Sequence, residues 1–486
     1  MKAKAILKLL ALLLVMLSAF MLSSAAVASY YRESVRVVES FVLPAVGCIL
    51  FAVAVFALTP GKERPYFSAK SGYLFVSLAW VAASAVGALP FLLSGTIPSF
   101  TDAFFETMSG FTTTGATVFA DVEVLPRSIL LWRSTTHWLG GMGIVVLTVA
   151  IFPLLGLGGL QLVEAEAPGP SVDKITPHMS GTSKRFWLIY VMLSATEAGL
   201  LFLGGMGLFD AVNHTFATMA TGGFSTRNAS VGYFKSGYVD AVITAFMVLA
   251  GMNFSLFYKV AKGRIKEALR DPELRVYLSI FLGGSLLIAF DLLRNRVFGG
   301  GFGTAFRYGA FQSATVLTTT GFATADFDLW PPFSRTVLVA LMFVGGCSGS
   351  TAGGVKVVRY LMLLKQSLTE LKYLVFPRGV FAVRLGGTPV RKMMIFDAAS
   401  FFFLYLATAM ACTLVVSSAG YGFETSFTAA LATLGNIGPG LGLVGPVRNY
   451  GHFPAYVKWA LSFAMLAGRL ELYTVFVLFS PEYRRR

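Results

Sequence analysis

Four similar stretches of small and hydroxyl-bearing residues recur along the chain at intervals of about 100 residues. One reads F-E-T-M-S-G-F-T-T-T-G-A at 105–116, and nearly the same letters, F-Q-S-A-T-V-L-T-T-T-G-F, occur at 311–322. Looser copies are F-A-T-M-A-T-G-G-F at 216–224 and F-T-A-A-L-A-T-L-G-N-I at 427–437. We align the copies on Gly115, Gly222, Gly321 and Gly435. Recurrence of one unit at a roughly constant period indicates an internally repeated architecture.

The glycine in each copy points to cation binding by the backbone. A chain that directs successive carbonyl oxygens along one axis must alternate its dihedral angles, and glycine reaches positive φ at no steric cost. Rings of such carbonyls replace the water shell of a dehydrated cation in potassium channels. Four copies would therefore build one pore with pseudo-fourfold symmetry. The alternative, a simple turn between helices, suits one copy better than four in matching context.

The composition is that of a polytopic membrane protein. Hydrophobic residues make up 56% of the 486 residues and charged residues 13%, whereas soluble domains are about a quarter charged. The net charge of +15 would also suit nucleic-acid binding, but we expect Lys and Arg to be gathered in cytoplasmic loops and no nucleic acid to be bound. Cys48, Cys347 and Cys412 match no metal-ligand or disulfide pattern. No H-E-x-x-H pair or phosphate-binding loop occurs in the sequence.

Apolar runs predict two N-terminal spans and then four units, each with an outward span, a short re-entrant helix and a return span. Non-helical backbone is tolerated at membrane depth only inside protein or along a wet cavity. The fold class is thus an all-α polytopic membrane protein with four M1–pore helix–M2 repeats around one pore. The predicted domains are the N-terminal pair at 1–70 and repeats at 71–160, 161–265, 266–375 and 376–486.

The expected elements have the following bounds. The N-terminal spans are 5–28 and 37–59; the first resembles a cleavable signal peptide, but its length favours a retained helix. Outward spans are expected at 72–94, 186–208, 275–293 and 393–419, and re-entrant helices at 100–112, 210–219, 304–317 and 424–433. Return spans are expected at 128–156, 237–258, about 333–371, and 454–479.

In this layout most of the 39 Lys and Arg residues fall on one side of the membrane. The excess predicts that this side, with both termini, is cytoplasmic. The outer mouths instead carry acidic residues, which would raise the local cation concentration if they formed a rim, or are ordinary solvated acids. They are Asp102, Glu106, Asp121, Glu123, Asp326 and Asp328.

The third return span contains ten consecutive small or polar residues, half of them glycine. Each interior glycine costs a helix about 1 kcal/mol relative to alanine, and no other return span has such a run. We expect it to unwind into a gating loop below the filter, although close helix packing also uses small residues. The segment is Gly345, Gly346, Cys347, Ser348, Gly349, Ser350, Thr351, Ala352, Gly353 and Gly354.

Arg469 lies deep in the last span, where a charge is costly and usually faces the protein interior. Its guanidinium could hold the carbonyls of the unwound segment or act as an electrostatic barrier. The alternative is an ion pair with Glu471 or Glu197 that orders the bundle. Lys356 and Arg359 are expected to snorkel to the cytoplasmic face.

The chain resembles the TrkH branch of the Trk/Ktr/HKT superfamily of potassium transporters. The resemblance is carried by the stretch at 105–116, by W-R-S-T-T-H-W-L-G-G-M-G-I-V-V-L at 132–147, and by A-T-G-G-F-S at 220–225. It is carried further by G-G-C-S-G-S-T-A-G-G-V-K at 345–356 and L-G-N-I-G-P-G at 434–440. These segments lie in all four repeats, and the two leading spans suit this branch.

The resemblance implies potassium uptake through a homodimer in a prokaryotic cytoplasmic membrane, regulated by a cytosolic, nucleotide-binding, TrkA-like subunit. It implies that 345–354 is the gate, that Arg469 contacts it, and that no organic cofactor is needed. Glycine in all four copies goes with potassium over sodium in this family. One departure is Leu434, where the other copies have threonine, which predicts an asymmetric innermost site. The implied filter is Thr114, Gly115, Ala116, Thr221, Gly222, Gly223, Thr320, Gly321, Phe322, Leu434, Gly435 and Asn436, with potassium at the first two residues of each set.

Two other classes of function fit the sequence less well. A sodium- or proton-coupled carrier of a larger solute would need charged residues in broken helices of inverted repeats, whereas these repeats run in one direction and only the third return span is expected to break. A membrane enzyme would need a clustered acid–base or metal set at one face, and the sequence offers none.

Overall fold

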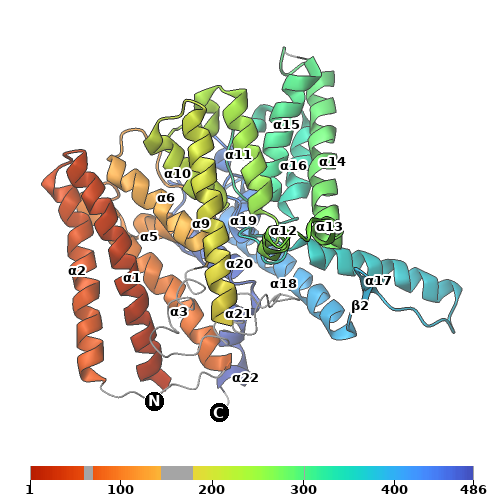
Figure 1. Ribbon diagram of the computed structural model, residues 1–486, viewed down its shortest axis with the longest axis horizontal. Helices are drawn as coiled ribbons and strands as arrows, with labels where there is room; N and C mark the ends of the chain where they lie inside the picture. The colour runs from red at the N-terminus through yellow and green to blue at the C-terminus, as the bar shows by residue number, and fades with distance from the viewer. Residues whose placement is uncertain (1, 60–68, 144–178, 300, 485–486) are drawn as a thin grey trace.

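The computed structural model describes residues 2–59, 69–143, 179–299 and 301–484 and is built almost entirely of helices (Figure 1). In these residues six helices are long and apolar enough to cross a membrane, or up to eight if each of two sharply bent helix pairs counts as one span. The predicted class, an all-α polytopic membrane protein, is confirmed.

The N-terminal pair stands at one edge of the molecule (Figure 1). Helix α1 (Lys2–Tyr30) runs unbroken through residues 26–28, the cleavage site that a signal peptide would need. It packs against α2 (Val35–Leu58). Leu43, Leu50 and Val53 of α2 are mostly exposed, as expected of a face covered by lipid.

The remaining helices follow the predicted order of outward helix, pore helix and return helix four times. The outward helices are α3 (Ala69–Gly87) with α4 (Leu89–Ser94), α9 (Met179–Leu203), α14 (Pro272–Arg294) and α18 (Lys392–Ser417). The pore helices are α5 (Phe100–Phe111), α10 (Leu208–Met219), α15 (Gly301–Leu317) and α19 (Phe423–Leu434). The domain boundaries stay a prediction, because the one near 160 lies outside the described residues.

Each return helix is interrupted or ends early in the described residues. They are α6 (Arg127–Gly141), α11 (Gly237–Ala250) with α12 (Phe254–Ala261), α16 (Pro332–Met342) with α17 (Val357–Val375), and α20 (Ala455–Arg469) with α21 (Tyr473–Phe476). Short elements complete the fold: α13 (Ile265–Leu269), α22 (Pro481–Arg484), η2 (Ser230–Phe234), η3 (Phe327–Leu329), η4 (Gly442–Val444), η5 (Val477–Phe479), β1 (Arg384–Leu385) and β2 (Thr388–Pro389).

The expectation that only the third return span breaks is wrong. The axes of α11 and α12 differ by 97°, and α20 is bent by 112° from the helical segment after it. Asn253 restarts the second helix by accepting a hydrogen bond from the Ser255 amide, and Glu471 and Leu472 turn the fourth with φ of 53° and 58°. The second half of the expected span 128–156 lies outside the described residues.

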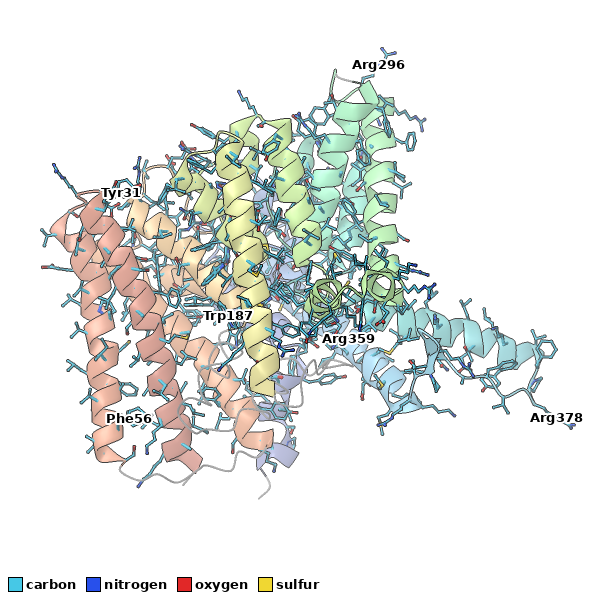
Figure 2. The ribbon with its side chains drawn as sticks, viewed as in Figure 1. Tyr31, Phe56, Trp187, Arg296, Arg359 and Arg378 are labelled. Carbon is cyan, nitrogen blue, oxygen red and sulfur yellow. The ribbon has the colours of Figure 1, made fainter. Side chains whose placement is uncertain are left out.

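Helix α17 projects sideways from the bundle as an arm (Figure 1). Arg378 lies at its far tip, whereas Arg359, near its start, lies toward the middle of the molecule (Figure 2). The chain returns through the antiparallel hairpin β1–β2, whose turn residues Gly386 and Gly387 have φ of 55° and 89°. Positive φ at both positions is what a two-residue hairpin turn requires.

Polar contacts join each return helix to the next unit in the same rotational order. Three are ion pairs from a return helix to the following pore helix, and the junction between the first and second units is a hydrogen bond to a loop carbonyl. This order closes the four units into a ring. The contacts are Asp240–Arg307 (3.3 Å), Arg335–Glu424, Lys458–Asp102 (2.6 Å), and Arg133 to the Ser225 carbonyl (3.2 Å).

Within the first unit, a buried ion pair ties the pore helix to the return helix. Glu106 Oε1 lies 2.8 Å from Arg133 Nε, and the two side chains are 0% and 2% exposed. The carboxylate also accepts hydrogen bonds from the Thr117 hydroxyl and the Val118 amide. Glu106 therefore fixes the chain that follows the first glycine turn.

We expect Glu106→Gln to destabilise the protein by about 3–5 kcal/mol, because it leaves the buried Arg133 without a counter-charge. The measurement is thermal unfolding in detergent, followed by tryptophan fluorescence. Glu267→Gln is the matched control, since its pair with Arg264 is more than 60% exposed on both sides and should contribute about 1 kcal/mol or less. Equal effects of the two substitutions would contradict this account.

Candidate functional site

All four pore helices end in the same hydrogen-bonded turn. In each, one amide donates to the carbonyl three residues back and the next amide to the carbonyl five residues back, at 2.8–3.2 Å. This is the Schellman arrangement, which needs a left-handed residue just past the helix. The pairs of donors are Thr113 and Thr114, Thr221 and Gly222, Thr319 and Thr320, and Asn436 and Ile437.

The backbone after each pore helix takes positive φ twice, two residues apart. The first residue of each pair has φ of 53–57° and is Thr113, Thr221, Thr319 or Asn436. The second is a glycine with φ of 77–96°: Gly115, Gly223, Gly321 or Gly438. The left-handed conformation costs a residue with a Cβ roughly 1–2 kcal/mol, and such strain, when over-determined by its surroundings, is typical of functional sites.

The four glycines form a closed ring of backbone contacts. A Cβ on Gly115 would overlap the carbonyl oxygen of Gly222, and one on Gly223 that of Thr320. A Cβ on Gly321 would overlap the carbonyl of Ile437, and one on Gly438 that of Thr114. Each contact joins one unit to the next, and the fourth returns to the first. Only glycine lets four backbones meet this closely.

The structure corrects the sequence register in two units. Gly435 has φ of −78° and caps α19. Gly222 is not among the glycines with positive φ. The residues equivalent to Gly115 and Gly321 are instead Gly223 and Gly438. The position of Thr114 is held by Gly222 in the second unit and by Ile437, rather than by Leu434, in the fourth. Leu434 ends α19, and the asymmetry of the innermost site stays a prediction. The predicted Gly115 and Gly321 stand where the sequence placed them.

A small cavity of about 130 Å³ opens directly above this ring. The four ring glycines all line it, together with Arg133, Arg227 and other residues of the outer loops. The two arginines are paired with Glu106 and Asp210. The cavity is therefore shared by all four units, and it leads to the point where their backbones meet.

The expected acidic rim is only partly present. Glu106 is buried, while Asp102 and Asp328 pair with Lys458 and Arg335. Asp121 remains exposed, and a hydrogen bond from Asn228 lowers the pKa of its carboxyl group, which keeps it charged. Ion pairs with basic residues offset the charge of three of the six expected acids. These six residues therefore do not create a broad negative field at the mouth.

The described part of the motif at 132–147, residues 132–143, packs the first return helix against neighbouring helices and the end of its pore helix. The Trp132 indole donates to the Gly87 carbonyl at 3.0 Å, and His137 Nδ1 lies 2.7 Å from the Gly110 carbonyl. A Cβ on Gly140 would overlap the carbonyl of Phe111, and one on Gly468 in α20 that of Leu434. The first and fourth return helices thus approach the ends of their pore helices at equivalent glycines.

Residues 345–354 form an ordered loop, as the sequence predicts. Its two ends pair at Val344 and Val355, where the Gly345 amide donates to the Val355 carbonyl at 2.9 Å. The loop fills the break between α11 and α12: the Cys347 amide donates to the Gly251 carbonyl, and the Phe254 amide to the Gly349 carbonyl. The two interruptions satisfy each other's free backbone groups, which a lipid environment would leave unpaired.

The loop touches the inner end of the ring. The Gly353 amide donates to the Thr319 hydroxyl at 2.7 Å. A Cβ on Gly353 would lie 2.6 Å from the Gly435 carbonyl and 2.9 Å from Asn436 Cβ. Two of the four left-handed residues, Thr319 and Asn436, are therefore in contact with the loop.

Arg469 joins the loop to the first unit. Its guanidinium donates to the Thr351 carbonyl at 2.7 Å and to the carbonyls of Gly140 and Gly141 at 2.7 and 2.9 Å. The expected contact with the loop is present. Glu471, one of the alternative partners, pairs with Arg359 instead.

Lys356 and Arg359 do not snorkel. They are 8% and 4% exposed; Lys356 donates to the Ala352 carbonyl, and Arg359 pairs with Glu471. The bend after α20 turns Glu471 inward, and this supplies a buried counter-charge that sequence spacing did not reveal.

Comparison with known proteins supports the resemblance. The family model described as TrkH, cation transport protein, matches residues 40–484. Relatives named Trk system potassium uptake protein TrkH, from Salmonella typhimurium and Vibrio parahaemolyticus, are each 39% identical and cover at least 99% of both chains. TrkG of Escherichia coli is 37% identical over 96% of this chain and 95% of its own.

A solved structure agrees with these relatives. The crystal structure of the potassium transporter TrkH from Vibrio parahaemolyticus matches all of this chain with a TM-score of 0.89 at 36% identity, and all of that chain is covered. The chain therefore belongs to the TrkH family of cation transport proteins, and it is a multi-pass membrane transporter rather than an enzyme.

Proposed function

We propose that this protein carries potassium into the cell through the ring of four glycine turns. The observation that carries the proposal is the closed cycle of contacts among Gly115, Gly223, Gly321 and Gly438, below a cavity that all four units share. The names of the relatives, potassium uptake proteins, support potassium as the ion.

The filter would consist of backbone oxygens rather than acids. We assign it to residues 113–115, 221–223, 319–321 and 436–438, with potassium held by their carbonyls. Each pore helix ends at the ring, so its C-terminal partial negative charge, roughly half an elementary charge, is directed to the ion. Ala116 and Phe322 follow the first and third glycines, as Phe224 and Pro439 follow the others.

The gate would be the loop 345–354 with Arg469. Its support is the position of the loop, which bonds to Thr319 on one side and to Arg469 on the other. In the proposed open state these hydrogen bonds are broken and the loop lies aside, so that an ion leaves the ring toward the cytoplasm.

The remaining assignments concern assembly and orientation. Both termini are placed in the cytoplasm because Lys and Arg are concentrated on that side. The relatives are named as proteins of a Trk system, which supports a transporter working with a partner. We assign that partner to a cytosolic nucleotide-binding regulatory subunit of the TrkA kind, and the transporter itself to a homodimer.

Substitution of the ring glycines tests the filter. Gly438→Ala should lower rubidium or potassium uptake into liposomes about tenfold or more, because alanine is strained at φ of 96° and would press on the Thr114 carbonyl. Gly115→Ser and Gly321→Ser should lower the ratio of potassium to sodium uptake. Gly435→Ala is the matched control and should keep most of the flux, because φ there is −78° and the nearest atom to an added Cβ, the Leu431 carbonyl oxygen at 2.9 Å, is farther than the oxygens that a Cβ on a ring glycine would meet.

The opposite order, with Gly435→Ala impaired and Gly438→Ala normal, would restore the register aligned on Gly435. Unchanged flux and selectivity in both serine variants would refute the carbonyl filter.

Deletion of residues 348–353 tests the gate. We expect higher potassium flux from the deletion variant, because the segment that contacts Thr319 is removed, while the ratio of potassium to sodium flux stays near that of the parent protein. Flux in liposomes and gel filtration of the same sample are the measurements. Unchanged or lower flux from a well-folded deletion variant would assign the loop to packing.

Cysteine labelling tests the orientation. The three native cysteines are free and buried, so an exposed cysteine should dominate the reaction with a membrane-impermeant maleimide. In intact cells Val124→Cys should react and Leu269→Cys should not; the native side chains are 74% and 58% exposed. The reverse result would invert the topology.

A further inference from the structure

A buried carboxylate outside the filter and away from Arg469 also contacts the loop. Glu273 lies in the first turn of α14 and is 8% exposed. Its Oε1 atom accepts two backbone hydrogen bonds, from the Ser348 amide at 2.8 Å and from the Val358 amide at 3.0 Å. One oxygen thus connects a residue inside the loop to a residue just beyond it.

The bond to Val358 serves the start of α17. Helix α17 begins at Val357, so the Val358 amide is among the first four that have no partner within the helix. The residue before the helix is Lys356, whose side chain makes no capping bond and has no acceptor. Glu273 therefore supplies, from a different helix, the capping acceptor that α17 lacks.

The bond to Ser348 is not needed for capping. Ser348 lies ten residues before Val358 along the chain, inside the loop. Without Glu273, the buried Ser348 amide and the partly buried Val358 amide would lose their acceptor. The carboxylate thus holds the loop to α14 and to the first turn of α17 at once.

The charged side chains near Glu273 make their hydrogen bonds and ion pairs with other groups. Asp271 caps α14 by accepting from the Leu274 amide at 2.9 Å, Lys356 donates to the Ala352 carbonyl, and Arg359 pairs with Glu471. Arg469 contacts the loop at another residue, Thr351. The loop is accordingly held at two points, by Arg469 of α20 and by Glu273 of α14.

We propose that Glu273 is a positioning residue that latches the loop 345–354 in its closed position below the filter. The proposal rests on the proposed gating function of the loop. It assigns closure to two backbone hydrogen bonds on one carboxylate oxygen, in addition to the contact made by Arg469.

The test compares Glu273→Leu, which removes the acceptor at similar volume, with Glu273→Gln, which keeps an acceptor oxygen on an amide group. Rubidium uptake into liposomes should rise about fivefold or more for leucine, which loses both hydrogen bonds, and about twofold for glutamine, whose amide oxygen can still accept them. The ratio of potassium to sodium uptake should not change. Glu267→Leu, an exposed carboxylate on α13, is the matched control and should have parental flux.

Each variant is also made together with the deletion of 348–353. If Glu273 acts through the loop, its substitution adds nothing once the loop is deleted. Parental flux in both Glu273 variants, while the deletion alone raises flux, would overturn the latch and leave the gate standing. An equal gain in the deletion background would also overturn it. A deletion that fails to raise flux would instead refute the gate itself. If the leucine variant does not fold, the glutamine variant decides by the same criteria.

Discussion

The whole structure depends on the close approach of four backbones at one point. Each ring glycine lies where a Cβ would overlap the carbonyl oxygen of the next unit, and the cycle closes only if all four units are held in place together. The buried Glu106–Arg133 pair, the contacts between successive units, and glycines 140 and 468 behind the ring all serve this placement. The charged side chains of these ion pairs lie outside the ring and hold its units together.

The interrupted return helices follow from the same constraint. Helix ends inside a membrane leave amides and carbonyls that lipid cannot satisfy with hydrogen bonds. Here the loop 345–354 bonds to the free groups in the break between α11 and α12. Arg469 donates hydrogen bonds to the carbonyls at the end of α6. The interruptions therefore meet around one point below the ring. The loop is held by hydrogen bonds to neighbouring segments rather than by a continuous helix, which is consistent with the gating role proposed for it.

The sequence predicted the repeats, the pore helices and the unwound segment, because apolar length, recurrence and glycine content are local signals. It misplaced the register of the glycine turns in the second and fourth units. Alignment of the four sequences favoured Gly222 and Gly435. The backbone instead repeats a three-residue pattern, in which a polar residue in the left-handed conformation is followed by any residue and then by glycine. The pattern reads Thr-Thr-Gly, Thr-Gly-Gly or Asn-Ile-Gly. The tolerance of asparagine for the left-handed region was the available clue at Asn436. The bends after Ala250 and Arg469, and the pairing of Arg359 with Glu471, depend on tertiary contacts that spacing along the chain does not encode.

The central claim is that backbone oxygens of the four turns bind the transported ion on a common axis. The most direct test is a structure determined in potassium, and again with rubidium or thallium, to locate ion density. The account predicts density on the axis between the turns that end in Gly115, Gly223, Gly321 and Gly438, beside the carbonyls that precede them. Absence of density there, with the heavy ion bound at side-chain carboxylates elsewhere, would contradict it.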